Sequence, residues 1–126
     1  MVNSDGRTIL YIDDDAANRH LMTRLFGRKM PGDHLVVAAT GREGLEHVPG
    51  DGIDMVLLDL TLPDMSGEEV LQTLKEAHEI PVVILSGHDD PETRRRLTER
   101  GADAYVTKPF DANELFSLIE GLLDQS

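Results

Sequence analysis

The chain has 126 residues, 40% of them hydrophobic and 29% charged, which is typical of one globular domain and excludes a disordered or multidomain protein. The 12 Lys and Arg residues against 24 Asp and Glu residues give a formal charge of -12, which argues against direct nucleic-acid binding because phosphate backbones would be repelled. The sequence contains no apolar run long enough to span a membrane, no signal peptide at its start and no cysteine, so we expect a soluble, cytoplasmic protein without membrane insertion.

Five short apolar runs alternate with segments of helical pattern along the chain. The predicted strands are 9–12, 35–39, 55–60, 82–86 and 104–107, and the predicted helices are 16–28, 42–47, 67–78, 91–100 and 112–123. Continuous apolar runs are typical of strands covered on both faces, so the fold class is α/β, a doubly wound parallel sheet with helices on both sides. We assign 8–123 to this domain, 1–7 to a polar lead-in and 124–126 to a tail.

Polar residues gather where the predicted strands end, which is where ligands bind in open parallel sheets. These residues are Asp13, Asp14 and Asp15 after the first run, Asp59 in the third, Ser86 and Gly87 at the fourth, and Thr107, Lys108 and Pro109 at the fifth. Neighbouring carboxylates repel one another, and Mg²⁺ bound by their oxygens is the simplest remedy. One carboxylate can then act as the nucleophile toward a phosphoryl group whose oxygens contact Lys108 and Ser86.

The same residues also have purely structural interpretations. An acidic triplet before a helix is commonly an N-terminal cap, and Ser86 and Lys108 taken singly are ordinary turn and surface residues. Asp59 differs, because a carboxylate after four apolar residues lies at a strand end or is buried, and burial without a partner is costly. The five histidines show no ligand spacing, and His88 alone falls near the predicted site. The shared location of the polar residues favours the phosphate and metal interpretation.

From about Thr8 to Leu123 the chain resembles a response-regulator receiver domain of two-component signalling. The resemblance is carried by four motifs in the order and spacing of that family, namely LYIDDD, LLDLTLPDMSG, VVILSG and GADAYVTKPF. It implies a flavodoxin-like sheet with strand order 2-1-3-4-5. It also implies a phosphoacceptor signalling domain that is not an enzyme, with self-phosphorylation from small phosphodonors and autodephosphorylation as its intrinsic activities.

The resemblance further implies a role for each residue at the strand ends. Asp59 is the implied phosphoacceptor, and Ser86 and Lys108 are the implied contacts of the phosphoryl oxygens. The implied Mg²⁺ ligands are Asp13, Asp14, Asp59 and the backbone carbonyl of Thr61.

The resemblance also covers positions around these site residues. Ser86 and Tyr105 match the switch pair, and Lys108–Pro109 matches a peptide bond that is typically cis. Thr61 and His88 match positions that influence the rate of dephosphorylation. Pro63 and Gly67 shape the loop after Asp59.

A histidine kinase or histidine phosphotransfer protein is the implied phosphodonor. The downstream protein target would meet the face formed by the fourth helix, the fifth strand and the fifth helix. The sequence leaves open the cognate kinase, the output, the phosphate lifetime and whether the chain forms a homodimer. It also does not distinguish a standalone regulator from a receiver cut from a hybrid kinase or a longer regulator.

Two alternative functions remain open. The acidic triplet contains the D-x-D pattern of small Mg²⁺-dependent haloacid-dehalogenase-like phosphatases, in which Asp13 would carry the phosphoryl group. Ala17 and the lack of an acidic pair after a later strand depart from that family, and Asp59 would have no role in it. The other alternative is a receiver-like interaction module that works without phosphorylation.

Overall fold

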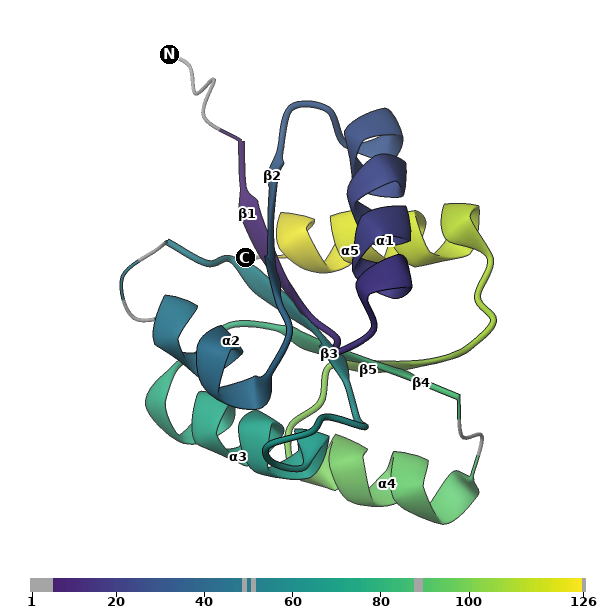
Figure 1. The fold of residues 1–126 in the computed structure, drawn as a ribbon. Coiled ribbons are helices and arrows are strands. Elements are labelled where there is room, and N and C mark those ends of the chain that lie inside the picture. Colours follow the sequence, from purple (N-terminus) through teal and green to yellow (C-terminus); the bar gives the residue numbers. More distant parts are fainter. Residues whose placement is uncertain (1–5, 49, 51, 88–89, 126) are drawn as a thin grey trace.

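A computed structural model describes residues 6–48, 50, 52–87 and 90–125 as five strands and five helices in strict alternation (Figure 1). The strands are β1 Thr8–Ile12, β2 His34–Ala38, β3 Met55–Asp59, β4 Val82–Ser86 and β5 Ala104–Thr107. The helices are α1 Ala16–Lys29, α2 Gly41–His47, α3 Gly67–Ala77, α4 Pro91–Glu99 and α5 Ala112–Asp124. His88 and parts of the predicted lead-in and tail, 1–5 and 126, lie outside the described residues.

The strands form one sheet in the order β2-β1-β3-β4-β5, and every neighbouring pair is parallel. The predicted fold class and strand order are therefore confirmed, and each element boundary lies within one residue of its predicted position. No helix in the described part of the chain is long and apolar enough to cross a membrane.

The sheet is the middle layer of three, with α1 and α5 on one face and α2, α3 and α4 on the other (Figure 1). Side chains alternate between these faces along each strand. In β1, Ile9 and Tyr11 pack toward α1 and α5, whereas Leu10 and Ile12 pack toward α2, α3 and α4. Burial of both faces explains why the central strands are continuous apolar runs.

Carboxylate and hydroxyl caps fix where all five described helices begin. Asp15, Thr40, Ser66, Asp90 and Asp111 each precede a helix and accept a hydrogen bond from a backbone amide in its first turn. One member of the acidic triplet, Asp15, therefore does act as the cap that its position suggests, and it leaves Asp13 and Asp14 for another use.

The loop between β3 and α3 is held tightly at both ends. The Asp64 carboxylate accepts hydrogen bonds of 2.9 Å from the amides of Gly41 and Arg42, which ties the loop to the start of α2. A Cβ atom on Gly67 would lie 2.6 Å from the Leu60 Cα, so glycine is needed for this close approach. These contacts fix the path of the chain that follows Asp59.

Candidate functional site

Three carboxylates converge at the carboxyl edge of the sheet, the edge at which the parallel strands end. β1 and β3 are neighbours, and Asp13, Asp14 and Asp59 each place one carboxylate oxygen within 4.8 Å of the others. Asp13 is 0% exposed and Asp59 is 9% exposed, whereas Asp14 is exposed. The structure thus brings together the acidic residues that the strand-end pattern had placed side by side.

Lys108, which follows β5, contributes a positive charge to this cluster. Its Nζ lies 3.2 Å from Asp59 Oδ2 and 3.4 Å from Asp13 Oδ2, so the ammonium group lies between the two buried carboxylates. The Lys108 amide donates to the Ser86 carbonyl at 2.7 Å, and the Lys108–Pro109 peptide bond is cis. Three carboxylates around one ammonium group leave an excess of negative charge at this edge.

Asp13 is held by several neutral donors in addition to Lys108. The Tyr11 hydroxyl donates to Asp13 Oδ2 at 2.6 Å, and the side-chain amide of Asn18 donates to the same oxygen at 3.3 Å. The backbone amide of Asp15 donates to Asp13 Oδ1 at 2.9 Å. Neither Tyr11 nor Asn18 is among the site residues predicted from the sequence. The one available signal for Tyr11 is a phenol within a run of otherwise aliphatic residues.

Asp59 has fewer donors than Asp13. Its Oδ1 accepts from the Thr61 amide at 3.1 Å and its Oδ2 accepts from Lys108. Burial, reinforced by the charge of Asp13, raises the pKa of Asp59 above its usual 3.8, and the Thr61 amide and Lys108 offset this only in part. Burial also acts on Asp13, but the hydrogen bonds from Tyr11 and the Asp15 amide and the charge of Lys108 together lower the pKa of Asp13.

The remaining predicted residues lie in β4, in the loop after β3 and in β5. Ser86 is buried at the end of β4, and β4 pairs with β3 so that Leu85 lies opposite Asp59. Thr61 lies in the loop beyond β3 and is exposed. Tyr105 is half-buried in β5, with the Arg94 guanidinium 4.7 Å from the centroid of its ring.

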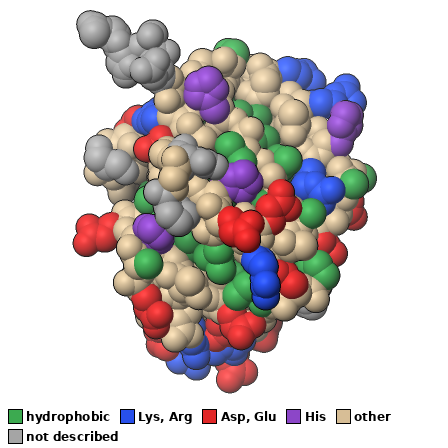
Figure 2. Space-filling view, turned by 60° about the vertical axis from the view of Figure 1, so that its left-hand side comes forward, with side chains coloured by type: hydrophobic (Ala, Val, Ile, Leu, Met, Phe, Trp, Pro, Cys, Tyr) green, Lys and Arg blue, Asp and Glu red, His purple; other side chains and the backbone are tan. Residues whose placement is uncertain are grey.

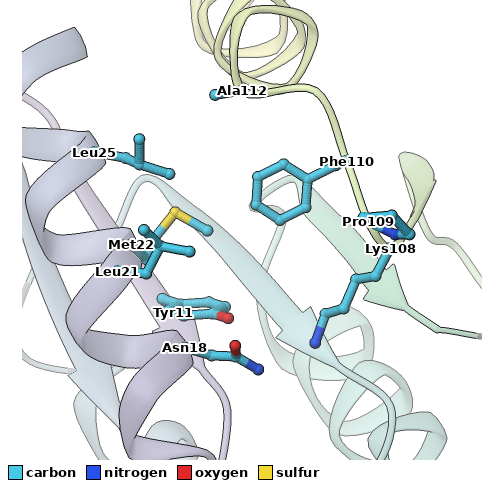
Figure 3. A pocket seen from close by; sticks show the side chains of 9 residues that line it. All are labelled: Tyr11, Asn18, Leu21, Met22, Leu25, Lys108, Pro109, Phe110 and Ala112. Atoms are coloured by element: carbon cyan, nitrogen blue, oxygen red, sulfur yellow. The ribbon is translucent and has the colours of Figure 1, made fainter.

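A groove of about 430 Å³ runs beside the cluster between α1 and the segment that joins β5 to α5 (Figure 3). Leu21, Met22 and Leu25 line it from α1, and Phe110 lines it from the opposite side. Lys108 and Asn18 lie at the end nearest the carboxylates. Leu21 is 51% exposed, the one large hydrophobic residue of the described part of the chain that is classed as exposed, and it lies on the apolar part of the groove.

The basic side of α4 is matched by acidic groups. Arg96 and Arg100 both form ion pairs with Glu68 of α3, at 3.2 and 2.7 Å, and Arg95 pairs with Glu99. Basic and acidic side chains lie next to one another at the lower edge of Figure 2, and α3 and α4 lie at the bottom of the molecule in Figure 1. The two pairs with Glu68 join α4 and the residue that follows it to α3, the helix that begins directly after the Asp59 loop.

The fold and the site define an α/β domain with an acidic pocket at the carboxyl edge of its sheet, and comparisons with known proteins agree. Residues 9–120 match the response regulator receiver domain family. The cell cycle transcriptional regulator CtrA of Caulobacter vibrioides is 36% identical over 119 residues, which cover 94% of this chain and 51% of CtrA. The transcriptional regulatory protein CpxR of Escherichia coli is 35% identical over 118 residues, which cover 94% of this chain and 50% of CpxR.

Solved structures give the same result. The CheY-like receiver domain protein of Methanospirillum hungatei superposes with a TM-score of 0.86 at 30% identity, covering 95% of both chains. The BeF₃-activated DrrB receiver domain superposes with a TM-score of 0.82 at 30% identity, covering 94% of this chain and 98% of that one. The chain therefore belongs to the response regulator receiver domain family, and it spans about half the length of the curated relatives it matches.

Replacing Asp59 with asparagine is expected to raise the thermal unfolding midpoint of the metal-free protein by several degrees at neutral pH. The raised pKa means that the folded protein binds this proton more tightly than the unfolded chain, so ionisation of Asp59 destabilises the fold. The increase in the unfolding midpoint that Asp59→Asn produces therefore grows as pH rises through the folded-state pKa of Asp59. It disappears at about pH 4 and below.

Calorimetry of both proteins in EDTA across this pH range measures the difference. Asp124→Asn, at a side chain that is 73% exposed, is the matched control and should change the midpoint little. A midpoint for Asp59→Asn that equals or falls below that of the parent at neutral pH would contradict the assigned direction.

Proposed function

We propose that this domain accepts a phosphoryl group on Asp59 from a histidine kinase or histidine phosphotransfer protein, with Mg²⁺, and thereby changes the surface that it offers to a downstream protein. The observation that carries the proposal is the unequal setting of the two buried carboxylates. The Asp13 side chain is 0% exposed and is covered by donors, whereas the Asp59 side chain is 12% exposed and lies between Lys108 and the Thr61 amide. An incoming phosphoryl group can therefore reach Asp59.

The proposed step is the attack of a carboxylate oxygen of Asp59 on the phosphorus of a phosphohistidine. The O–P bond of an acyl phosphate forms, the N–P bond of the donor breaks, and the imidazole nitrogen leaves with the electron pair of that bond. Lys108 is already within 3.2 Å of Asp59, where it neutralises charge on the phosphoryl oxygens as the bond forms. Ser86, buried at the end of the next strand, is the proposed hydrogen-bond donor to another of these oxygens.

The donor set fits Mg²⁺, which prefers carboxylate and carbonyl oxygens and keeps several sites for water and phosphate oxygens. We assign Asp13, Asp14, Asp59 and the Thr61 carbonyl as its ligands, on the convergence of the three carboxylates and the position of Thr61 two residues beyond Asp59. Bound there, the ion supplies positive charge to the carboxylates and to the transferring group.

The phosphatase alternative would require the phosphoryl group on Asp13. The Asp13 side chain is 0% exposed, whereas that of Asp59 is 12% exposed, so an incoming phosphoryl group has access to Asp59 and not to Asp13. We therefore propose a signalling domain rather than an enzyme, with phosphorylation by small donors and autodephosphorylation as its intrinsic chemistry. We also propose that it works in the cytoplasm, since the absence of cysteine agrees with a reducing compartment.

Acetyl phosphate or phosphoramidate with Mg²⁺ is expected to add one phosphoryl group to Asp59. Intact mass spectrometry reports the number of groups, and peptide mapping after borohydride trapping reports the residue. Asp59→Asn should abolish the addition, whereas Asp124→Asn should leave it unchanged because Asp124 lies at the end of α5. Modification at Asp13, or labelling of the Asp59→Asn protein, would overturn the assignment.

The groove between α1 and the β5–α5 segment is the proposed seat of the protein phosphodonor. It begins at Lys108, which contacts Asp59, and continues over the exposed apolar side chain of Leu21. A donor that brings a phosphohistidine to Asp59 must cover the surface beside it, and an apolar helix face would bury this groove.

Leu21→Glu is therefore expected to slow transfer from a phosphorylated protein donor by about tenfold or more, equivalent to roughly 1.4 kcal/mol of lost binding. Labelling by acetyl phosphate should be unaffected, because a small donor needs no groove. Gln125→Glu, which adds the same charge at the C-terminal end of α5, is the control and should transfer at the parent rate. Equal losses with both kinds of donor would show that Leu21 acts on the site itself.

The proposed output runs from Asp59 through Ser86 to β5 and α4. Ser86 lies opposite Thr107 in the sheet register, and Arg94 of α4 donates to the Thr107 hydroxyl at 3.2 Å while its guanidinium lies over the Tyr105 ring. Movement of Ser86 toward a phosphoryl group would free space for the Tyr105 ring to turn, and that turn would break its contact with Arg94. The face formed by α4, β5 and α5 is the proposed docking surface for the downstream target.

A beryllofluoride complex, in which BeF₃ on Asp59 stands in for the phosphoryl group, is expected to shift amide NMR signals around Ser86, Tyr105 and α4 as well as those at Asp59. Ser86→Ala should weaken the distant shifts and preserve those at Asp59. Ser117→Ala, at an exposed serine of α5, is the matched control. Shifts confined to the surroundings of Asp59 would describe a phosphate acceptor without a switch.

A further inference from the structure

The ring of Tyr11 packs in the core, but its buried hydroxyl adds nothing to that packing. Tyr11 is 2% exposed and its ring lies in the apolar cluster between β1, α1 and α5, where phenylalanine would fill the same space. A buried phenol oxygen needs a polar partner, and here that partner is Asp13 Oδ2 at 2.6 Å. Figure 3 shows the ring beside Met22, with its oxygen at the end that faces Lys108.

The Tyr11 hydrogen bond differs from that of Lys108 in one respect that bears on function. The Lys108 ammonium is shared between Asp13 and Asp59, and its side chain is 24% exposed. Any group that arrives at Asp59 competes with Asp13 for this ammonium. The Tyr11 hydroxyl donates to Asp13 Oδ2, whereas no hydrogen bond between it and Asp59 is found among the described residues, and Tyr11 is 2% exposed although it borders the groove.

We propose that Tyr11 is a positioning residue for the metal site, whose hydroxyl fixes the Asp13 carboxylate so that its oxygens stay directed toward the position where Asp14 and Asp59 converge. The inference rests on the proposed Mg²⁺-dependent function. A donor that orients a metal-ligating carboxylate acts on metal affinity, and the loss of such a donor typically weakens binding 10- to 100-fold. The phenol is neutral, so it orients Asp13 without cancelling the charge that attracts the cation.

The test is Tyr11→Phe, which removes the hydroxyl and keeps the ring. Isothermal titration of the metal-free protein with MgCl₂ is expected to show a dissociation constant raised by about tenfold or more. In parallel, the Mg²⁺ concentration that gives half-maximal labelling by acetyl phosphate should rise by a similar factor. The labelling rate at saturating Mg²⁺ should return to within about twofold of the parent, because only metal binding is weakened.

Two controls separate positioning from folding and from the proposed function itself. Phe26→Leu lies in the same apolar cluster, at a ring 5.8 Å from Phe116, and should lower the unfolding midpoint without changing Mg²⁺ affinity. Asp14→Ala, which removes an assigned ligand, should abolish most of the Mg²⁺ binding.

Unchanged or tighter Mg²⁺ binding by Tyr11→Phe would overturn the inference and leave the proposed function intact. A loss of affinity shared equally by Phe26→Leu, or a labelling rate that saturating Mg²⁺ does not restore, would assign Tyr11 a structural role and also overturn it. A parent protein that binds no Mg²⁺ would overturn the proposed function, and the inference with it.

Discussion

The repulsion between carboxylates at the carboxyl edge of the sheet is the constraint on which the rest of this structure depends. Parallel pairing of β1 with β3 forces Asp13 and Asp59 into one partly buried space, and Asp14 adds a third charge at its mouth. Hydrogen-bond donors that offset this repulsion are distributed unequally between Asp13 and Asp59. Asp13 receives four donors and its pKa falls, whereas Asp59 receives two and its pKa rises. The unsatisfied charge is therefore concentrated on the more accessible carboxylate, which is the group that gains most from a cation.

Lys108 connects this local electrostatic balance to the rest of the domain. Its ammonium bridges the two buried carboxylates, and its amide is bonded to the Ser86 carbonyl. The adjoining strand carries Tyr105, over which Arg94 of α4 is placed. In the proposed function, a change in the charge at Asp59 would act on a segment that is already in contact with α4, so the proposed coupling needs only side chains that touch.

The sequence was sufficient to predict the element boundaries and the grouping of residues at the strand ends, because these depend on local chemistry and strand order. Caps and breakers set the element boundaries, and the strand-end pattern placed Asp13 beside Asp59. Three features could not be read in this way, because each depends on how particular side chains are placed in the folded chain. Tyr11 looks like any core residue of an apolar run until Asp13 lies at 2.6 Å. The sequence predicted a cap from the acidic triplet but left open which member forms it, and in the structure it is Asp15, whose side chain accepts from the Asn18 backbone amide. Glu68 pairs with arginines about 30 residues away only because α3 and α4 lie side by side.

In the proposed function, input and output meet at one short segment. Lys108 lines the groove that would seat the phosphodonor and also bonds the phosphoacceptor, while the strand before it carries Tyr105 toward α4. Two binding events that act on a shared element are thermodynamically linked, and the linkage is reciprocal. If phosphorylation of Asp59 draws Lys108 away from the groove, the affinity for the donor must fall by the same factor by which a bound donor disfavours the phosphorylated arrangement. The geometry that transmits the signal would then also release the spent donor.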